Sequence, residues 1–166
     1  MAELVVQVVP FQDDWFDKYE QERERLQAVV NDVTRDIEHI GSTSVRGLAA
    51  KPIIDIALRL ATVQQVPDLL EPLARLGYTY EGEYGLPGRH FFIRGEPRAF
   101  HLHLVDDTTN HWQRWITFRD LLRRNPMLRQ AYQQLKYELA CKYRFDRAKY
   151  SDSKSDFINS AVQGFI

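Results

Sequence analysis

The residues with the clearest chemical potential lie between positions 38 and 56. A short β-like segment ends at Gly41-Ser42-Thr43, and a loop of mostly small side chains leads to a second β-like segment that carries one acid, Asp55. Small residues let backbone N–H groups approach an anion closely, and the hydroxyls of Ser42 and Thr43 add donors. An acid on the next strand can hold a divalent cation against phosphate oxygens. This layout favours binding of a triphosphate with a metal ion; the alternative is a plain tight turn in which Asp55 caps a neighbouring group.

Two groups of basic residues could neutralise phosphate charge. Arg46 and Lys51 lie in the loop itself, where the alternative is a solvated side chain. In the C-terminal part, basic and aromatic residues alternate, a pattern that can stack on bases and neutralise phosphates. The alternative is a basic outer helix face that balances an acidic helix near the N-terminus. The members of this second group are Lys136, Lys142, Arg144, Arg147, Tyr150 and Lys154.

A mixture of strands and helices must position these residues. Alternating or β-branched segments predict strands at residues 4–9, 36–40, 53–58, 78–83, 91–94 and 100–105. Apolar residues at helical spacing predict helices at 15–30, 62–76 and 111–123, another that starts at Asn125-Pro126, and a last one from Ser153 or Ser155 to the end.

Local signals connect these elements into one architecture. Thr62 and Gln65 have the spacing of a capping box, and glycines in the gaps between the last three strands predict antiparallel hairpins. We therefore expect the α+β class: a mixed sheet flanked by helices, with a helical C-terminal third, in a single domain over residues 1–166.

Four segments in order resemble the GrpB family (UPF0157) of the nucleotidyltransferase superfamily, and the match runs nearly end to end. They are Glu38-His39-Ile40-Gly41-Ser42-Thr43, Lys51-Pro52-Ile53-Ile54-Asp55, His101-Leu102-His103, and Tyr150 with Lys154-Ser155-Asp156-Phe157. The resemblance implies a nucleotidyltransferase-like fold, Mg²⁺-assisted binding of a nucleoside triphosphate, and transfer of a nucleotidyl group to a hydroxyl. It also implies that Lys136 and Lys154 contact phosphate.

The strand of Asp55 departs from the superfamily pattern. Active members carry a second acid two residues later, where this chain has Ala57. Residues 55 and 57 point to the same face of a strand, so one of two neighbouring metal ligands is missing. Two-metal phosphoryl chemistry needs several carboxylates, and this argues against conventional activity.

His101 and His103 offer a partial replacement, because residues two apart on a strand share a face. If their strand lies beside Asp55, as the superfamily implies, the three side chains could hold a transition metal, since imidazole suits Zn²⁺, Mn²⁺ or Fe²⁺ better than Mg²⁺. The expected cofactor is therefore a divalent metal, Mg²⁺ or Mn²⁺, with Zn²⁺ as a further option. One histidine could instead act as general base on an acceptor hydroxyl. Further alternatives are contact with an anionic substrate, or two imidazoles that merely fill a half-buried sheet face.

Composition limits the partners. Lys and Arg number 22 against 23 Asp and Glu, for a net charge of -1, so nucleic acid is not an expected partner. The single cysteine, Cys141, excludes an internal disulfide and a cysteine-based zinc site; we expect it, Trp112 and Trp115 to be buried. No segment approaches the ~20 apolar residues that cross a bilayer, and no signal peptide is evident. We therefore expect a cytoplasmic protein without a membrane partner.

Three functions follow from these observations. The first is metal-dependent transfer of a nucleotidyl group from a nucleoside triphosphate to an unidentified small-molecule or protein hydroxyl. Here Asp55, His101 and His103 are the catalytic and metal-binding residues, and Gly41, Ser42, Thr43, Arg46, Lys51, Lys136 and Lys154 bind the nucleotide. The second is an accessory module that kept the nucleotide or anion pocket and lost catalysis. The third is a metal-dependent hydrolase.

Overall fold

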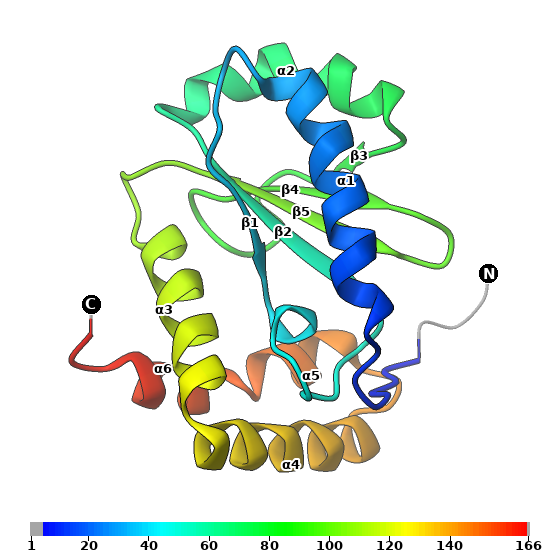
Figure 1. Ribbon diagram of the computed structural model, residues 1–166, viewed down its shortest axis with the longest axis vertical. Coiled ribbons are helices and arrows are strands. Elements are labelled where there is room, and N and C mark those ends of the chain that lie inside the picture. The colour runs from blue at the N-terminus through cyan, green and yellow to red at the C-terminus, as the bar shows by residue number, and fades with distance from the viewer. Residues whose placement is uncertain (1–4, 166) are drawn as a thin grey trace.

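The computed structural model describes residues 5–165 and contains a mixed five-stranded sheet flanked by helices (Figure 1). The strand order is β1-β2-β5-β4-β3. β2 and β5 are parallel, and every other neighbouring pair is antiparallel. The predicted α+β class and the hairpin pairing of the last three strands are confirmed. The strands are Ile37–Ile40 (β1), Ile54–Arg59 (β2), Thr79–Tyr80 (β3), His90–Arg94 (β4) and Phe100–Val105 (β5).

Two helices cover one face of the sheet and build the main core with it. α1 (Asp14–Val30) packs Trp15 and Leu26 against apolar side chains of β2 and β5, and α2 (Val66–Arg75) adds Leu69 and Leu73. The predicted capping box is present at Thr62 and Gln65, in the turn η2 (Val63–Gln65) that leads into α2. The face covered by α1 and α2 is mainly apolar, apart from the buried pairing of Glu22 on α1 with Arg94 on β4.

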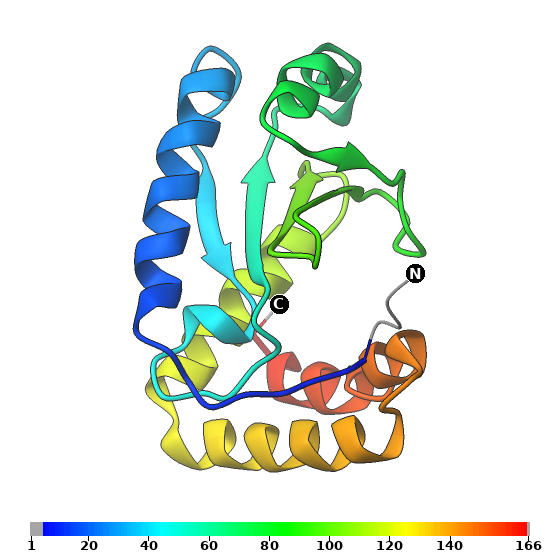
Figure 2. The ribbon, with the colours of Figure 1, turned by 90° about the vertical axis from the view of Figure 1, so that its right-hand side faces the viewer.

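Four helices form the C-terminal part: α3 (His111–Arg124), α4 (Pro126–Lys142), α5 (Arg147–Asp152) and α6 (Ser155–Val162). Asn125 caps α4 as predicted, since its side chain accepts from the Leu128 N–H at 3.0 Å. Figure 2 shows α4, α5 and α6 at the end of the sheet where β1 ends and β2 begins. This arrangement brings the C-terminal helices to the Gly41 turn and to the start of β2.

Several expectations from the sequence are wrong in detail. Within residues 5–9 only Val9 pairs, in an isolated bridge to Ala50, while residue 4 lies outside the described part of the chain. The strand expected at residues 78–83 shrinks to β3, because glycine-containing turns follow it. A helix over residues 147–152 was not anticipated. Cys141 is exposed, and Trp112 and Trp115 are only partly buried.

None of the helices within residues 5–165 combines the length and apolar character needed to cross a membrane.

Candidate functional site

The parallel pairing of β2 with β5 brings the predicted acid and histidines together. Asp55 is paired with His101, and Ala57 with His103, so all four side chains share the face that α1 and α2 leave free. Asp55 Oδ1 lies 2.9 Å from His103 Nε2 and 3.6 Å from His101 Nδ1. The sequence prediction that these three residues converge is therefore confirmed in its geometry, while their roles stay predictions.

Burial and hydrogen bonding together shift the pKa values of Asp55 and His103. Burial favours a raised pKa for Asp55, but hydrogen bonds from His101 and His103 outweigh it and hold the pKa below its usual range. Burial lowers the pKa of His103, although Asp55 acts against this. The neutral His103 then donates from Nε2 to the carboxylate, while its Nδ1 faces Arg89 Nη1 at 3.5 Å. The Nε2 atom of His101 is buried and has no hydrogen-bond partner within residues 5–165.

Gly41 follows the end of β1 and lies against the carboxylate of Asp55. Its backbone has φ +72° and ψ -175°, a conformation that is essentially restricted to glycine. A Cβ at this position would lie 2.7 Å from Asp55 Oδ2. The glycine of the predicted phosphate loop is therefore required by the close approach of backbone to carboxylate.

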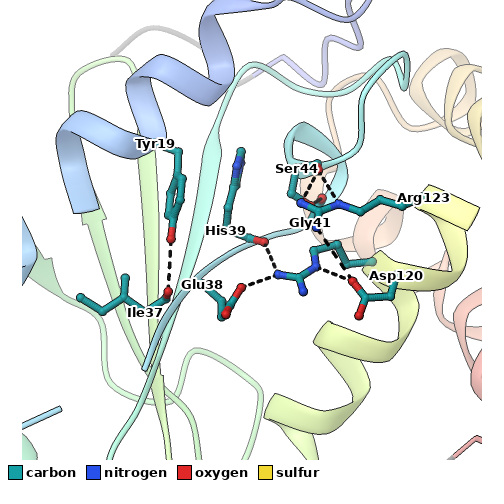
Figure 3. A network of polar contacts seen from close by, with 9 residues as sticks. Tyr19, Ile37, Glu38, His39, Gly41, Ser44, Asp120 and Arg123 are labelled. Atoms are coloured by element: carbon teal, nitrogen blue, oxygen red, sulfur yellow. Dashed lines mark hydrogen bonds and ion pairs between the residues drawn. The ribbon is translucent and has the colours of Figure 1, made fainter. Parts of the chain in front are cut away.

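Two arginines of α3 fix the turn that follows Gly41 (Figure 3). Arg123 donates to the carbonyl of Ser44 at 2.8 and 3.0 Å, and the Ser44 hydroxyl donates to the carbonyl of Gly41. Arg119 bridges Glu38 and Asp120, with contacts of 2.7 and 2.9 Å, and also donates to the carbonyl of His39. The Glu38 carboxylate is therefore paired with an arginine of α3.

His39 and Thr43 lie away from the candidate site. His39 stacks on Tyr19 with 4.6 Å between ring centroids, and its Nε2 lies 2.9 Å from the Thr43 hydroxyl. Both side chains are buried. Burial lowers the pKa of His39 to about 3, so the ring is neutral. The structure therefore does not place Thr43 beside Asp55, because its hydroxyl is buried against His39.

A cationic group gathers beside Asp55 from the loop before β2 and from α4, α5 and α6. Lys51 and Lys154 Nζ lie over the Tyr150 ring, at 5.0 and 4.5 Å from its centroid. Burial and the charges of Lys154 and Arg147 lower the pKa of Lys51 to about 7, whereas Asp55 acts in the opposite direction. Burial lowers the pKa of Lys154 to about 8, again against Asp55. These cations are therefore close enough to repel one another.

The deepest member of this group is Lys136 on α4. It is 1% exposed, and its Nζ donates to the carbonyl of Ala49. Burial, followed by the charges of Lys154 and Lys51, lowers the pKa of Lys136 to about 6. Lys136 thus supports the loop from the inside, and the structure places it beneath the other two lysines. Ser42 joins the same region through a hydrogen bond with Tyr132.

Other predicted binding residues lie elsewhere. Arg46 pairs with Asp13 at 3.2 Å and lies over the Phe16 ring, on the α1 side of the molecule. Lys142 and Arg144 are exposed and contact the aromatic residues next to them in the chain. The C-terminal basic pattern therefore divides: Lys136, Arg147 and Lys154 lie in the group around Lys51, and the other two residues lie outside it.

Sequence reasoning missed three residues of the site. Arg89 lies next to His103, and Arg98 is close enough to Lys51 and Arg147 to affect their pKa values. Tyr84 acts on the pKa values of Arg89 and Arg147. The three belong to loops around β4, where the only available signal was an aromatic and two arginines among turn residues.

The donor set does not fit the two-metal centre that the superfamily implies. Within residues 5–165 no three His, Cys, Asp or Glu side chains are arranged to hold a metal ion. Both imidazoles face the same oxygen of Asp55, His103 at 2.9 Å and His101 at 3.6 Å, and the place of a second carboxylate is taken by the buried Ala57. We therefore derive no chemical step through a metal.

Two cavities in the described part of the chain lie apart from this site. One of about 310 Å³ is lined by Trp15, Glu22, Arg94 and Phe100, below α1. The other, of about 660 Å³, lies between residues 5–8 and the end of α4.

Comparison with known proteins places the chain in a family. UPF0157 protein YqkA of Bacillus subtilis is 33% identical over 95% of this chain, which spans 46% of YqkA. The crystal structure of conserved protein GrpB from Enterococcus faecalis is 34% identical with a TM-score of 0.86, over 96% of this chain and 99% of that one.

A third match is weak. The structure of Cid1 in complex with the UTP analogue UMPNPP has a TM-score of 0.45 at 12% identity, over 79% of this chain and 43% of that one. A likeness at this level carries no conclusion about activity. The model of the GrpB protein family, by contrast, matches residues 5–164, and the chain therefore belongs to the GrpB family.

Proposed function

We propose that the site beside Asp55 binds a nucleoside triphosphate, chiefly through its phosphate chain. The observation that carries this proposal is the guanidinium of Arg147: its Nε and Nη1 are buried and have no hydrogen-bond partner within residues 5–165. Burying unpaired polar groups costs free energy, and an anion that accepts from both atoms would recover it.

The surroundings of Arg147 favour an anion with several charges. Lys51 and Lys154 form no ion pair within the described chain, and Asp55 is the acid whose charge reaches both of them. One carboxylate against three cations leaves a positive excess. A triphosphate matches this excess better than a single phosphate does, since each further phosphate oxygen adds a charge-assisted contact.

Isothermal titration of the full chain with ATP and with inorganic triphosphate, each with and without Mg²⁺, tests the proposal. We expect both to bind, and we expect Lys154→Met to weaken both at least tenfold. Lys149→Met is the matched control, because Lys149 is 69% exposed and pairs with Asp146 on α5. Failure of both compounds to bind at millimolar concentration, or equal losses in the two variants, would overturn the proposal.

Nucleotidyl transfer is the second candidate, and the free Nε2 of His101 favours it. Asp55 Oδ1 lies 3.6 Å from Nδ1 of this ring, and Nε2, which has no partner within residues 5–165, is the nitrogen available to accept a proton. A substrate hydroxyl oxygen would attack the α-phosphorus, the bond to the bridging oxygen of the β-phosphate would break, and pyrophosphate would leave. The hydroxyl proton would pass to His101 Nε2.

Pyrophosphate release separates the two candidates. An accessory module would bind ATP without turnover, whereas a transferase would release pyrophosphate from ATP in the presence of an acceptor. Release that survives in both Asp55→Asn and His101→Gln would contradict the assignment of this step to these residues.

A further inference from the structure

The loop between β3 and β4 holds an exposed aromatic side chain in a strained backbone conformation. Tyr84 has φ +50°, in a region that non-glycine residues seldom occupy, and its side chain is 51% exposed. Such strain persists where the surroundings hold it, often at ligand sites. In Figure 2 this loop projects from the sheet on the side away from α1.

Arg89 holds this loop and joins it to the Asp55 trio. Its guanidinium donates to the carbonyl of Glu83 at 3.1 Å and to that of Tyr84 at 2.9 Å. The other terminal nitrogen of the same guanidinium lies 3.5 Å from His103 Nδ1. One side chain therefore fixes both the backbone of Tyr84 and the edge of the candidate site.

The ring of Tyr84 contacts one aromatic ring and one guanidinium. It stacks on Phe91, with 5.0 Å between centroids and 28° between planes, and Phe91 in turn contacts His101 and His103 at 4.9 and 5.2 Å. Arg98 donates to the Tyr84 hydroxyl at 3.5 Å, and its guanidinium carbon lies 6.0 Å from the ring centroid. Stacking on Phe91 together with 51% exposure leaves a flat aromatic surface available to a ligand.

This aromatic surface adjoins the cationic group. Tyr84 and Arg98 are both close enough to Arg147 to affect its pKa, and Arg98 and Arg147 are both close enough to Lys51 to affect its pKa. A ligand whose phosphates meet Arg147 and Lys51 would thus carry its remaining part toward Tyr84. Aromatic rings bind planar groups by stacking, and every nucleobase presents such a face.

We propose that Tyr84 is a stacking platform for the base of the bound nucleotide, with Arg89 as the positioning residue of its loop. This inference rests on the proposed function and extends it: the ligand class is a phosphorylated compound with a planar aromatic group, and polyphosphate alone would use only part of the site.

Titration of ATP and inorganic triphosphate into three variants tests this platform. Tyr84→Gly removes the ring and suits the positive φ, so it does not threaten folding. Tyr84→Phe keeps the ring, and Tyr80→Ala removes another partly exposed tyrosine, from β3. We expect Tyr84→Gly to weaken ATP binding about tenfold, a size that base stacking supports. Its affinity for inorganic triphosphate should stay within twofold of wild type, as should both affinities of the other two variants.

The outcomes separate this inference from the proposed function. Equal ATP affinity in wild type and Tyr84→Gly, with triphosphate still bound, overturns the platform and leaves the phosphate site intact. Equal losses for ATP and triphosphate in Tyr84→Gly also overturn it, because the loop would then serve only structure. If neither compound binds the wild-type chain, both proposals fail.

Discussion

At the scale of single residues, the close approach of Gly41 to Asp55 leaves no room for a side chain at position 41. Gly41→Ala places a Cβ 2.7 Å from Asp55 Oδ2 and imposes a positive φ on alanine. We expect unfolding in denaturant to show a loss of roughly 1–3 kcal/mol from the backbone alone, and ATP affinity to fall because the carboxylate must move.

Gly47→Ala is the matched control for this change. Gly47 also has a positive φ, of +81°, but nothing lies within 4 Å of its Cβ position. It should lose stability through the backbone and keep its affinity for ATP. If the two variants bind ATP equally well, the contact between Gly41 and Asp55 does not shape the site.

His39 makes stability depend on pH. Burial lowers its pKa to about 3, whereas an unfolded histidine has a pKa of about 6.5. The unfolded chain therefore binds the proton first as pH falls, and stability decreases below pH 6.5 by up to about 1.4 kcal/mol per unit until the folded pKa is reached. His39→Gln removes this contribution while the carboxylates still titrate, so the stability of wild type relative to the variant should fall between pH 7 and 5. Parallel stability curves over this range would contradict a neutral, buried His39.

At the scale of elements, α3 and α4 offer a paired test of helix capping. Asn125 caps α4 through a hydrogen bond to the Leu128 N–H, whereas the side chain of Asn110, which precedes α3, caps nothing. Asn125→Ala should lower the free energy of unfolding by about 1 kcal/mol, and Asn110→Ala should change it much less. Thermal or denaturant unfolding of the two variants measures this difference, and equal losses would show that the cap is not what the side chain of Asn125 contributes.

Elements with local signals were predictable, and those defined by distant contacts were not. The β-branched run of β2, the capping box before α2 and the Asn125-Pro126 start of α4 all formed as expected. Residues 5–8 have strand-like side chains but no strand to pair with, because their contacts are to Arg144 and to the end of α4. Strand formation depends on a partner, which the sequence of one segment does not reveal.

The same limit applies to the candidate site. Asp55, His101 and His103 were predictable because alternation puts residues two apart on one face, and the parallel register then aligned the two strands. Thr43 was misjudged because the 3-10 turn rotates its hydroxyl toward His39. Arg89 and Tyr84 escaped notice because turn residues have no period, so only tertiary structure shows where their side chains lie.

At the scale of the whole molecule, the site is a junction between two parts of the chain. The sheet supplies Asp55 and the histidines, and the C-terminal helices supply Arg147, Tyr150 and Lys154. Positive charge is in excess at this junction. Burial lowers the pKa of Lys154 to about 8, and burial together with repulsion from neighbouring cations lowers the pKa values of Lys51 and Lys136 to about 7 and 6. Above neutral pH the folded protein therefore binds fewer protons on these lysines than the unfolded chain does. Its free energy of unfolding should consequently rise with pH in this range.

Proton uptake on binding follows from this imbalance. A polyphosphate favours the charged lysines and raises their pKa values, so at pH 7.5 the complex must take up protons that the free protein lacks. Titration of ATP or triphosphate in buffers with different ionisation enthalpies should therefore show net uptake, which falls in Lys51→Met and is unchanged in Lys149→Met. Proton release, or uptake that is the same in both variants, would mean that the lysines beside Asp55 do not meet the phosphates, and the charge argument for the site would fail with them.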